Sequence, residues 1–256
     1  MSKFITLVKK EFLEQKKTSR LLILIILFAF FAISSPILAK LTPQIIKSIQ
    51  TPGITINLPD PTSKDAIDQF VKNISQLISF VLVFMLAGAI ADEKSKKTLE
   101  IVLAKPINRS VFILAKFASY LASIKISFIL SAVIFYLYTR SVFGDFDLGR
   151  FTIISLLLLV YLLFISSVTL MGSAISKSTI AAAGIGFAGM ILFGTIAGYI
   201  KPISKYAPDY IIRHYPELLS NGWDIKFLPS AITSIILIFV FVLISIYVFK
   251  KQEVER

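Results

Sequence analysis

The side chains that most often carry covalent chemistry or bind metals are scarce in this 256-residue chain. It has no cysteine, one histidine (His214) and fifteen acidic residues, none of which lies within a long apolar run. Disulfides, iron–sulfur clusters and zinc sites built from several His and Cys ligands are therefore excluded by counting. The polar side chain that most needs an explanation is Lys125, because it lies near the middle of an apolar run.

Lys125 shares its apolar run with serines that recur every four residues. These serines are Ser119, Ser123, Ser127 and Ser131. At 100° per residue the serine stripe faces about 180° away from Lys125, and small residues in such a stripe favour close contact with another helix or subunit. Lys125 would then face water, a backbone carbonyl, or an anionic headgroup or substrate on a translocation path, unless it snorkels to the surface. An intramembrane hydrolase with Lys125 as its base is disfavoured, because the serines point away from it.

Six apolar runs are long enough to cross about 30 Å of hydrocarbon as helices. They are residues 21–39, 74–91, 111–138, 151–174, 179–200 and 227–249. The composition agrees, since 56% of the residues are hydrophobic and only 16% are charged, with a mean hydropathy of +0.81. The sequence therefore predicts an all-α membrane protein with six transmembrane helices.

The segments between the runs are too short to form a separate soluble domain. The longest, residues 40–73, falls below the length at which chains fold alone without disulfides or metals. Its prolines predict an extended extracellular linker. We therefore expect one transmembrane domain over residues 1–256.

The distribution of positive charge predicts the orientation. Lys and Arg are more numerous, and acids fewer, on the side that holds both termini. The positive-inside rule then places both termini in the cytoplasm of a multi-pass plasma-membrane protein. The net charge of +12 would suggest nucleic acid in a soluble protein, but here no nucleic-acid partner is expected. A cleaved secretory signal in the first run is the weaker alternative.

Two cytoplasmic segments have helical patterns. Residues 1–20 place apolar side chains such as Phe12 on one arc and lysines such as Lys9 and Lys10 on the other, which predicts an interfacial helix on anionic lipid. An unstructured basic anchor is the alternative. Residues 92–110 contain a short apolar stripe that ends at Pro106, which predicts a short amphipathic helix between two spans.

This second segment resembles the cytoplasmic signature of permeases in the type-two class of ABC exporters. The residues that carry the resemblance are Glu93, Lys94, Thr98, Leu99, Glu100, Leu103, Pro106, Arg109 and Lys116. The N-terminal Lys9-Lys10-Glu11-Phe12 is similar too. One departure is Lys97, which occupies a position where many members have glycine.

The resemblance implies one half of an ATP-driven exporter. Such a permease pairs with a second copy or a related chain, and it is served by two cytoplasmic ABC ATPase subunits that hold ATP and Mg, so this chain itself would bind no cofactor. Its N-terminal helix and the loop after the second span would touch the ATPases. The loop residues implied as the coupling helix are Glu93, Thr98, Leu99, Glu100, Leu103, Pro106 and Arg109.

The residues themselves support a division of labour between permease and ATPase. The sequence has no glycine-rich phosphate loop ending in Gly-Lys-Ser/Thr, and no segment could house a nucleotide-binding domain. Energy must therefore come from another chain, or from none. In the second case the protein would be a non-transporting scaffold or an immunity-type membrane protein.

The fifth run and the segment after it carry further patterns. Gly194 and Gly198 form a G-x-x-x-G motif, which fits intramolecular packing, a dimer seam or bending during transport. Residues 199–223 gather tyrosines, prolines and the single tryptophan, which predicts short interfacial or re-entrant pieces.

Overall fold

The computed structural model describes residues 2–49, 59–99, 108–222 and 224–252, and these are almost entirely helical. Six helices are long and apolar enough to cross a membrane, and the described residues contain no strand and no soluble domain. The predicted all-α class with six spans is confirmed.

The first half of the chain contains three of the long helices. The amphipathic α1 (Ser2–Lys17) leads into α2 (Arg20–Ile49). A second crossing is made by α3 (Ser63–Asn73), the π-helix η1 (Ile74–Ile78) and α4 (Ser79–Ser95). The longest helix, α6 (Arg109–Phe143), follows.

The second half begins with α7 (Leu148–Ile175) and then α8 (Thr179–Gly189), which continues through the π-helix η2 (Met190–Ile196) into α9 (Ala197–Tyr199). The short η3 (Ser204–Tyr206), α10 (Tyr210–Asn221) and η4 (Ile225–Phe227) precede the last long helix, α11 (Leu228–Lys251).

The expectation of an extended linker over residues 40–73 is wrong for 40–49 and 63–73, which are helical, and residues 50–58 lie outside the described chain. The helix α2 continues past Pro36 and Pro43 to Ile49, and α3 is already helical from Ser63. Hydroxyl groups next to both prolines donate to carbonyls of the preceding turn, from Ser35 to Phe31 and from Thr42 to Leu38. Thr62 and Asp65 begin α3 with a capping box.

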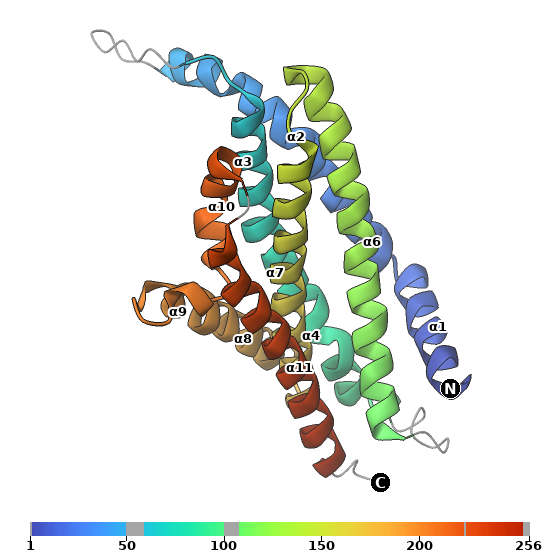
Figure 1. The fold of residues 1–256 in the computed structure, drawn as a ribbon. Coiled ribbons are helices and arrows are strands. Elements are labelled where there is room, and N and C mark those ends of the chain that lie inside the picture. Colours follow the sequence, from blue (N-terminus) through green and yellow to red (C-terminus); the bar gives the residue numbers. More distant parts are fainter. Residues whose placement is uncertain (1, 50–58, 100–107, 223, 253–256) are drawn as a thin grey trace.

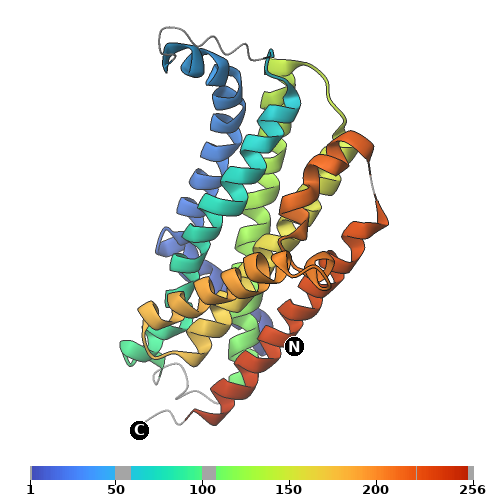
Figure 2. The same cartoon turned by 90° about the vertical axis from the view of Figure 1, so that its left-hand side faces the viewer.

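The helix α7 lies at the centre of the bundle. Buried residues make up 78% of its most apolar stretch, against 22% in α11. Its neighbours are α4, α8 and α11, while α2 and α1 pack on α6 (Figures 1 and 2). The helices α2 and α11 therefore present apolar side chains outward, as helices in contact with lipid or another subunit do.

The two ends of the bundle differ in what they contain. At one end, here called the α1 end, α1 packs beside the first half of α6, and α4 and α11 end there too (Figure 1). At the opposite end Arg150 of α7 donates hydrogen bonds to the carbonyls of Leu219 (2.7 Å) and Ser220 (3.1 Å) at the end of α10.

The fifth crossing is made by two pieces. The continuous helix α8–η2–α9 runs obliquely to its neighbours and ends about half way along the bundle in both views (Figures 1 and 2). After a short loop, α10 carries the chain on to the opposite end. This arrangement places the loop about half way along the bundle and α10 in the half that lies away from α1 (Figures 1 and 2).

Candidate coupling site at the α1 end

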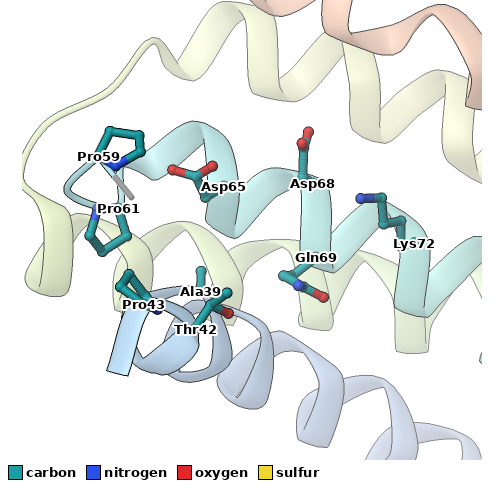
Figure 3. A pocket seen from close by; sticks show the side chains of 9 residues that line it. All are labelled: Ala39, Thr42, Pro43, Pro59, Pro61, Asp65, Asp68, Gln69 and Lys72. Atoms are coloured by element: carbon teal, nitrogen blue, oxygen red, sulfur yellow. The ribbon is translucent and has the colours of Figure 1, made fainter. Parts of the chain in front are cut away.

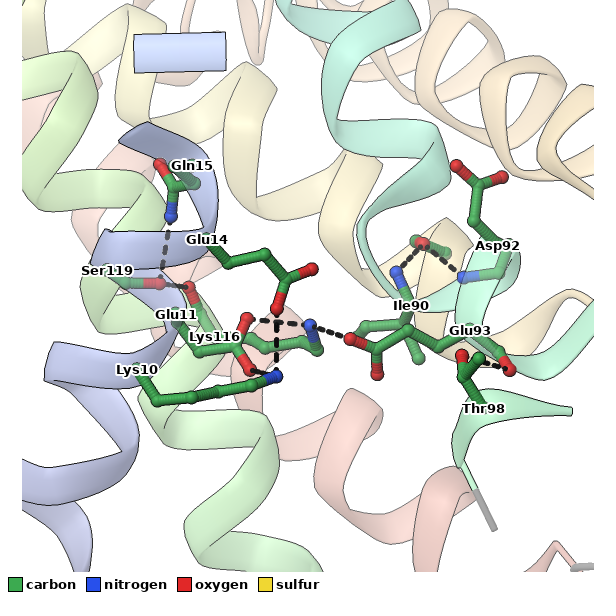
Figure 4. Close-up of polar contacts among 12 residues, drawn as sticks. Lys10, Glu11, Glu14, Gln15, Ile90, Asp92, Glu93, Thr98, Lys116 and Ser119 are labelled. Carbon is green, nitrogen blue, oxygen red and sulfur yellow. Dashed lines mark hydrogen bonds and ion pairs between the residues drawn. The ribbon is translucent and has the colours of Figure 1, made fainter. Parts of the chain in front are cut away.

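A buried lysine joins three helices at the α1 end. The Nζ atom of Lys116 on α6 lies 2.7 Å from Oε2 of Glu11 on α1 and 2.7 Å from Oε1 of Glu93 on α4 (Figure 4). The lysine side chain is 1% exposed. A charge this deep is tolerated when it is paired, because an uncompensated buried charge is strongly destabilising. We call Lys116, Glu11 and Glu93 the ion cluster.

The cluster extends along α1. The Nζ atom of Lys10 lies 3.0 Å from Glu11 and 2.9 Å from Glu14. Burial lowers the pKa of Lys10, but the hydrogen bond to Glu14 and the charge of Glu11 outweigh it and raise this pKa well above its usual range. Burial raises the pKa of Glu14, but Lys10 and Lys116 outweigh it, so this pKa falls. Both side chains are therefore charged at neutral pH.

The three carboxylates of Glu11, Glu14 and Glu93 lie within 4.8 Å of one another, a spacing that could hold a metal ion. Lys116 already bonds to two of them, so their positive partner is an ammonium group of the chain itself. The second oxygen of Glu93 is buried without a hydrogen-bond partner, which leaves it one unused acceptor.

The serine stripe of α6 packs against α1 and α2 of the same chain. The amide of Gln15 donates to Ser119 (3.1 Å) and its carbonyl accepts from Ser123 (2.7 Å). Further along, Ser131 donates to the carbonyl of Phe28 on α2 (2.8 Å), and Ser127 bonds within α6. All four serines are buried. The stripe thus fixes α1 to α6 beside the ion cluster.

Glu11 and Gln15 are the residues that sequence reasoning missed. They interrupt the apolar arc of α1, so they do not fit the pattern of a simple amphipathic helix. Their spacing of one helical turn matches that of Lys116 and Ser119–Ser123 on α6. The sequence pattern that could have indicated the contact is a lysine and a row of serines on one helix, together with an acid and an amide one turn apart on another.

Hydrogen bonds also fasten the end of α4 to α7 and α8. The hydroxyl of Ser173 accepts from the backbone amides of Ile90 (2.8 Å) and Ala91 (3.0 Å) and donates to the carbonyl of Ala87 (2.6 Å). Lys94 donates to the carbonyls of Ala174 and Ser176 at the end of α7. The hydroxyl of Thr179 bonds to Asp92. A displacement of this end of α4 would therefore reach α6, α7 and α8 together.

The predicted coupling residues fall partly in the described chain. Glu93 belongs to the ion cluster, Thr98 donates to the carbonyl of Glu93 (3.3 Å), and Leu99 is buried at 5% exposure. Arg109 donates to carbonyls at the end of α11, including those of Lys250 (3.2 Å) and Gln252 (2.6 Å), and so caps that helix. The remaining three, Glu100, Leu103 and Pro106, lie outside the described residues.

The departure at Lys97 has a structural correlate. Lys97 has a φ of 56°, in the left-handed region that favours glycine. A lysine here makes the same turn at a higher conformational cost than glycine would.

The remaining residues singled out from the sequence lie elsewhere. On α1, Lys9 is exposed and Phe12 is half-buried. Lys125 is exposed on α6, and among the described residues its side chain makes no hydrogen bond or ion pair. A cavity of about 190 Å³ lies between α2 and α3 near the opposite end, lined by prolines and polar α3 side chains, and Lys125 does not line it (Figure 3).

The G-x-x-x-G motif faces α10 of the same chain. A Cβ atom on Gly198 would lie 2.3 Å from a guanidinium nitrogen of Arg213 and 2.7 Å from a carboxylate oxygen of Asp209. At Gly194 the nearest atom is Cβ of Asp209, at 3.9 Å. Within this chain the motif therefore makes room for the Asp209–Arg213 pair.

The fold defines a multi-pass α-helical membrane protein whose ion cluster joins the N-terminal helix to the segment after the second span. Residues 5–254 match the ABC-2 family transporter proteins, so the chain belongs to this family and is a membrane transport protein. The expected family is confirmed. The chain is also similar to the uncharacterized transmembrane protein YxlG of Bacillus subtilis (strain 168), with 24% identity over 258 residues that cover 99% of each chain.

Proposed function

We propose that this chain is the transmembrane subunit of an ATP-driven exporter of the plasma membrane. Two copies, or this chain and a related permease, form the membrane part, and two cytoplasmic ABC ATPase subunits bind ATP and Mg. The α1 end faces the cytoplasm with both termini. The excess of Lys and Arg on that side supports this orientation.

The ion cluster is the observation that carries the proposal. It joins α1 and α4 through Lys116 of α6, and α4 leads directly into the predicted coupling segment. A rigid buried contact of this kind transmits displacement, since packed polar networks have few alternative arrangements. ATPase movement at residues 92–110 would thereby move α1, α6 and the α7 end as one body.

Arg109 adds a second connection from the coupling segment. It begins α6 directly after that segment and holds the carbonyls at the end of α11. The same displacement would therefore reach the sixth span. Both connections start within or beside the segment that the ATPase would touch.

The first experiment is co-purification in mild detergent with a Walker-type ATPase, followed by measurement of ATP hydrolysis. The complex is expected to hydrolyse ATP, and Glu93→Gln is expected to reduce the hydrolysis that depends on the permease. The matched control is Glu217→Gln, an exposed acid on α10 at the opposite end. If no ATPase accompanies the intact chain, the scaffold alternative is preferred and the exporter proposal fails.

A hydrolase within the membrane receives no support from the geometry. The four serines of α6 are committed to hydrogen bonds with α1, α2 or their own helix. They lie on the buried face of α6, whereas Lys125 lies on the exposed face. A serine nucleophile needs its base within hydrogen-bond reach, and this pairing does not supply one.

A further inference from the structure

The loop between α9 and α10 carries positive charge that no described residue neutralises. Lys201 and Lys205 are both exposed. Among the described residues neither ammonium group donates a hydrogen bond or joins an ion pair, although Lys205 lies over the ring of Tyr206 at 5.2 Å. We call residues 199–206 the cationic loop.

The next acid along the chain, Asp209, is already paired. The Oδ2 atom of Asp209 lies 3.0 Å from Nε of Arg213, and Nη2 of Arg213 lies 3.3 Å from Oδ1. The pair is seated on Gly198, and the guanidinium lies 5.9 Å from the ring centre of Tyr199. Because Asp209 offsets Arg213, the charges of the two lysines remain uncompensated.

The depth of this loop in the membrane follows from positions along α3 and α10. The hydroxyl of Tyr215 on α10 donates to Asp68 on α3 (2.7 Å), which sets the two helices level at that point. Asp68 lies about 9 Å before Ile74, where the apolar stretch begins, and Asp209 lies about 9 Å before Tyr215. Asp209 therefore lies near the outer edge of the apolar layer, and α9 lies on the α1 side of α10 (Figures 1 and 2).

Apolar side chains cover the surface that leads to the loop. Along η2 the exposed residues are Ile191, Leu192, Phe193 and Ile196, and the exposed Ile200 and Ile203 continue them into the loop. A cationic group at the edge of the hydrocarbon layer, with apolar surface directly beneath it, matches a molecule that has an anionic head and an acyl chain. Lysines at this depth reach headgroup phosphates through their long side chains.

We propose that the cationic loop binds an anionic amphiphile, with the negative group at Lys201 and Lys205 and the hydrocarbon chain along η2. Arg213 and Asp209 hold the loop in place through Gly198. That this amphiphile belongs to the substrate class rests on the exporter function proposed above. The binding itself does not.

The absence of cysteine from the chain gives a direct test. Ile200→Cys introduces the only thiol into the cationic loop and keeps every charge. The full-length variant, in phosphatidylcholine nanodiscs, is labelled with an uncharged water-soluble maleimide. Dodecyl phosphate at ten times its dissociation constant is expected to slow labelling about tenfold. Dodecyltrimethylammonium, which has the same chain length and the opposite charge, is expected to leave the rate unchanged.

A second variant tests the two lysines. Ile200→Cys/Lys201→Gln/Lys205→Gln is expected to lose the protection by dodecyl phosphate. The matched control, Ile200→Cys/Lys250→Gln/Lys251→Gln, removes two lysines from the end of α11 and is expected to keep it. Size-exclusion elution of each variant checks that it is folded. Equal protection by both amphiphiles, protection that survives loss of Lys201 and Lys205, or a thiol that does not react without added amphiphile would each overturn the proposal.

A change of lipid distinguishes two sources of the anion. If phosphatidylglycerol in the nanodisc protects the thiol and dodecyl phosphate adds nothing, the loop binds an anionic lipid of the bilayer. If only the added amphiphile protects, the loop selects a single-chain ligand, and both results support the site. None of these measurements requires an ATPase. Protection in a chain that recruits no ATPase would therefore reject the exporter function and retain the site.

Discussion

Lys116 and Lys125 lie on the same helix and have opposite environments. Lys116 is buried between Glu11 and Glu93, whereas Lys125 is exposed and has no hydrogen bond or ion pair within the described chain. The difference arises from helix geometry, since residues on opposite faces of α6 meet different neighbours. It teaches that a lysine in an apolar run is explained by the acids that other helices bring to it, some of them from outside the runs.

The largest effect is expected from removing the paired lysine. Lys116→Met leaves Glu93 without a counter-charge and Glu11 paired with Lys10 alone, and we expect it to destabilise the fold by about 3–5 kcal/mol. Thermal unfolding in detergent measures this loss. Lys125→Met is the control on the same helix, and its unfolding temperature is expected to stay unchanged.

The comparison breaks if both lysine variants lower the unfolding temperature equally. The role of charge pairing at Lys116 is supported further if neutralising the acids restores stability. In Lys116→Met/Glu11→Gln/Glu93→Gln no charge remains uncompensated, so much of the loss is expected to be recovered.

The next prediction distinguishes the contribution of the ion cluster to stability from that of the serine stripe beside it. Gln15→Leu removes two buried hydrogen bonds to Ser119 and Ser123, and we expect a loss of about 1–3 kcal/mol. Because those bonds fasten α1, limited proteolysis is expected to cleave the variant faster within α1. Leu13→Ala, at an exposed position of the same helix, is the control. An unchanged cleavage rate in Gln15→Leu would show that the ion cluster holds α1 alone.

A third cation of α6, Arg109, donates to backbone carbonyls and not to acids. Its removal tests whether such a contact contributes to stability, as the ion pairs of Lys116 do. Arg109→Gln removes a charged donor from the carbonyls at the end of α11, an effect of about 1 kcal/mol. Hydrogen exchange is expected to accelerate in the last turn of α11 and nowhere else. Arg140→Gln, which breaks an exposed pair with Asp145, serves as control. Equal exchange in the two variants would count against a capping role.

The smallest effect concerns the turn after α4. Lys97→Gly relieves a left-handed residue, and we expect a gain of about 0.5 kcal/mol, because the flexibility of glycine in the unfolded chain offsets part of the relief. Lys96→Gly, at a φ of −86°, is expected to be destabilising instead. Unfolding temperatures of the pair check the sign, and a loss of stability in both would contradict it.

Much of the fold could be predicted because hydrocarbon imposes simple constraints. Long apolar runs must be helical, so six spans followed from their length alone. The boundaries were less predictable. The prolines of residues 40–73, Pro43 among them, suggested an extended segment, but α2 continues through Pro43 to Ile49. The helical pattern of α3 was obscured by flanking prolines.

The candidate site was predictable in part. Glu93 and Arg109 were identified through a family resemblance, and the serine stripe through its spacing. The pairing of Glu11 and the role of Gln15 were not identified, because their partners on α6 are about a hundred residues away and no local pattern connects them. The seating of Asp209 and Arg213 on Gly198 was equally invisible, since the motif alone fits several kinds of contact.

Composition, run length and a local motif were enough to predict that the chain lies in a lipid bilayer, that it is helical and to which family it belongs. These are properties of the residues along the chain and need no knowledge of distant contacts. Tertiary structure decided which charges are paired. Whether a lysine is a buried connector or an exposed cation depends on the side chains that distant helices place within about 3 Å of it, and electrostatic energy in a poorly solvated site varies steeply over that distance. For this reason Lys116 is paired, whereas Lys125, Lys201 and Lys205 have no ion pair within the described chain.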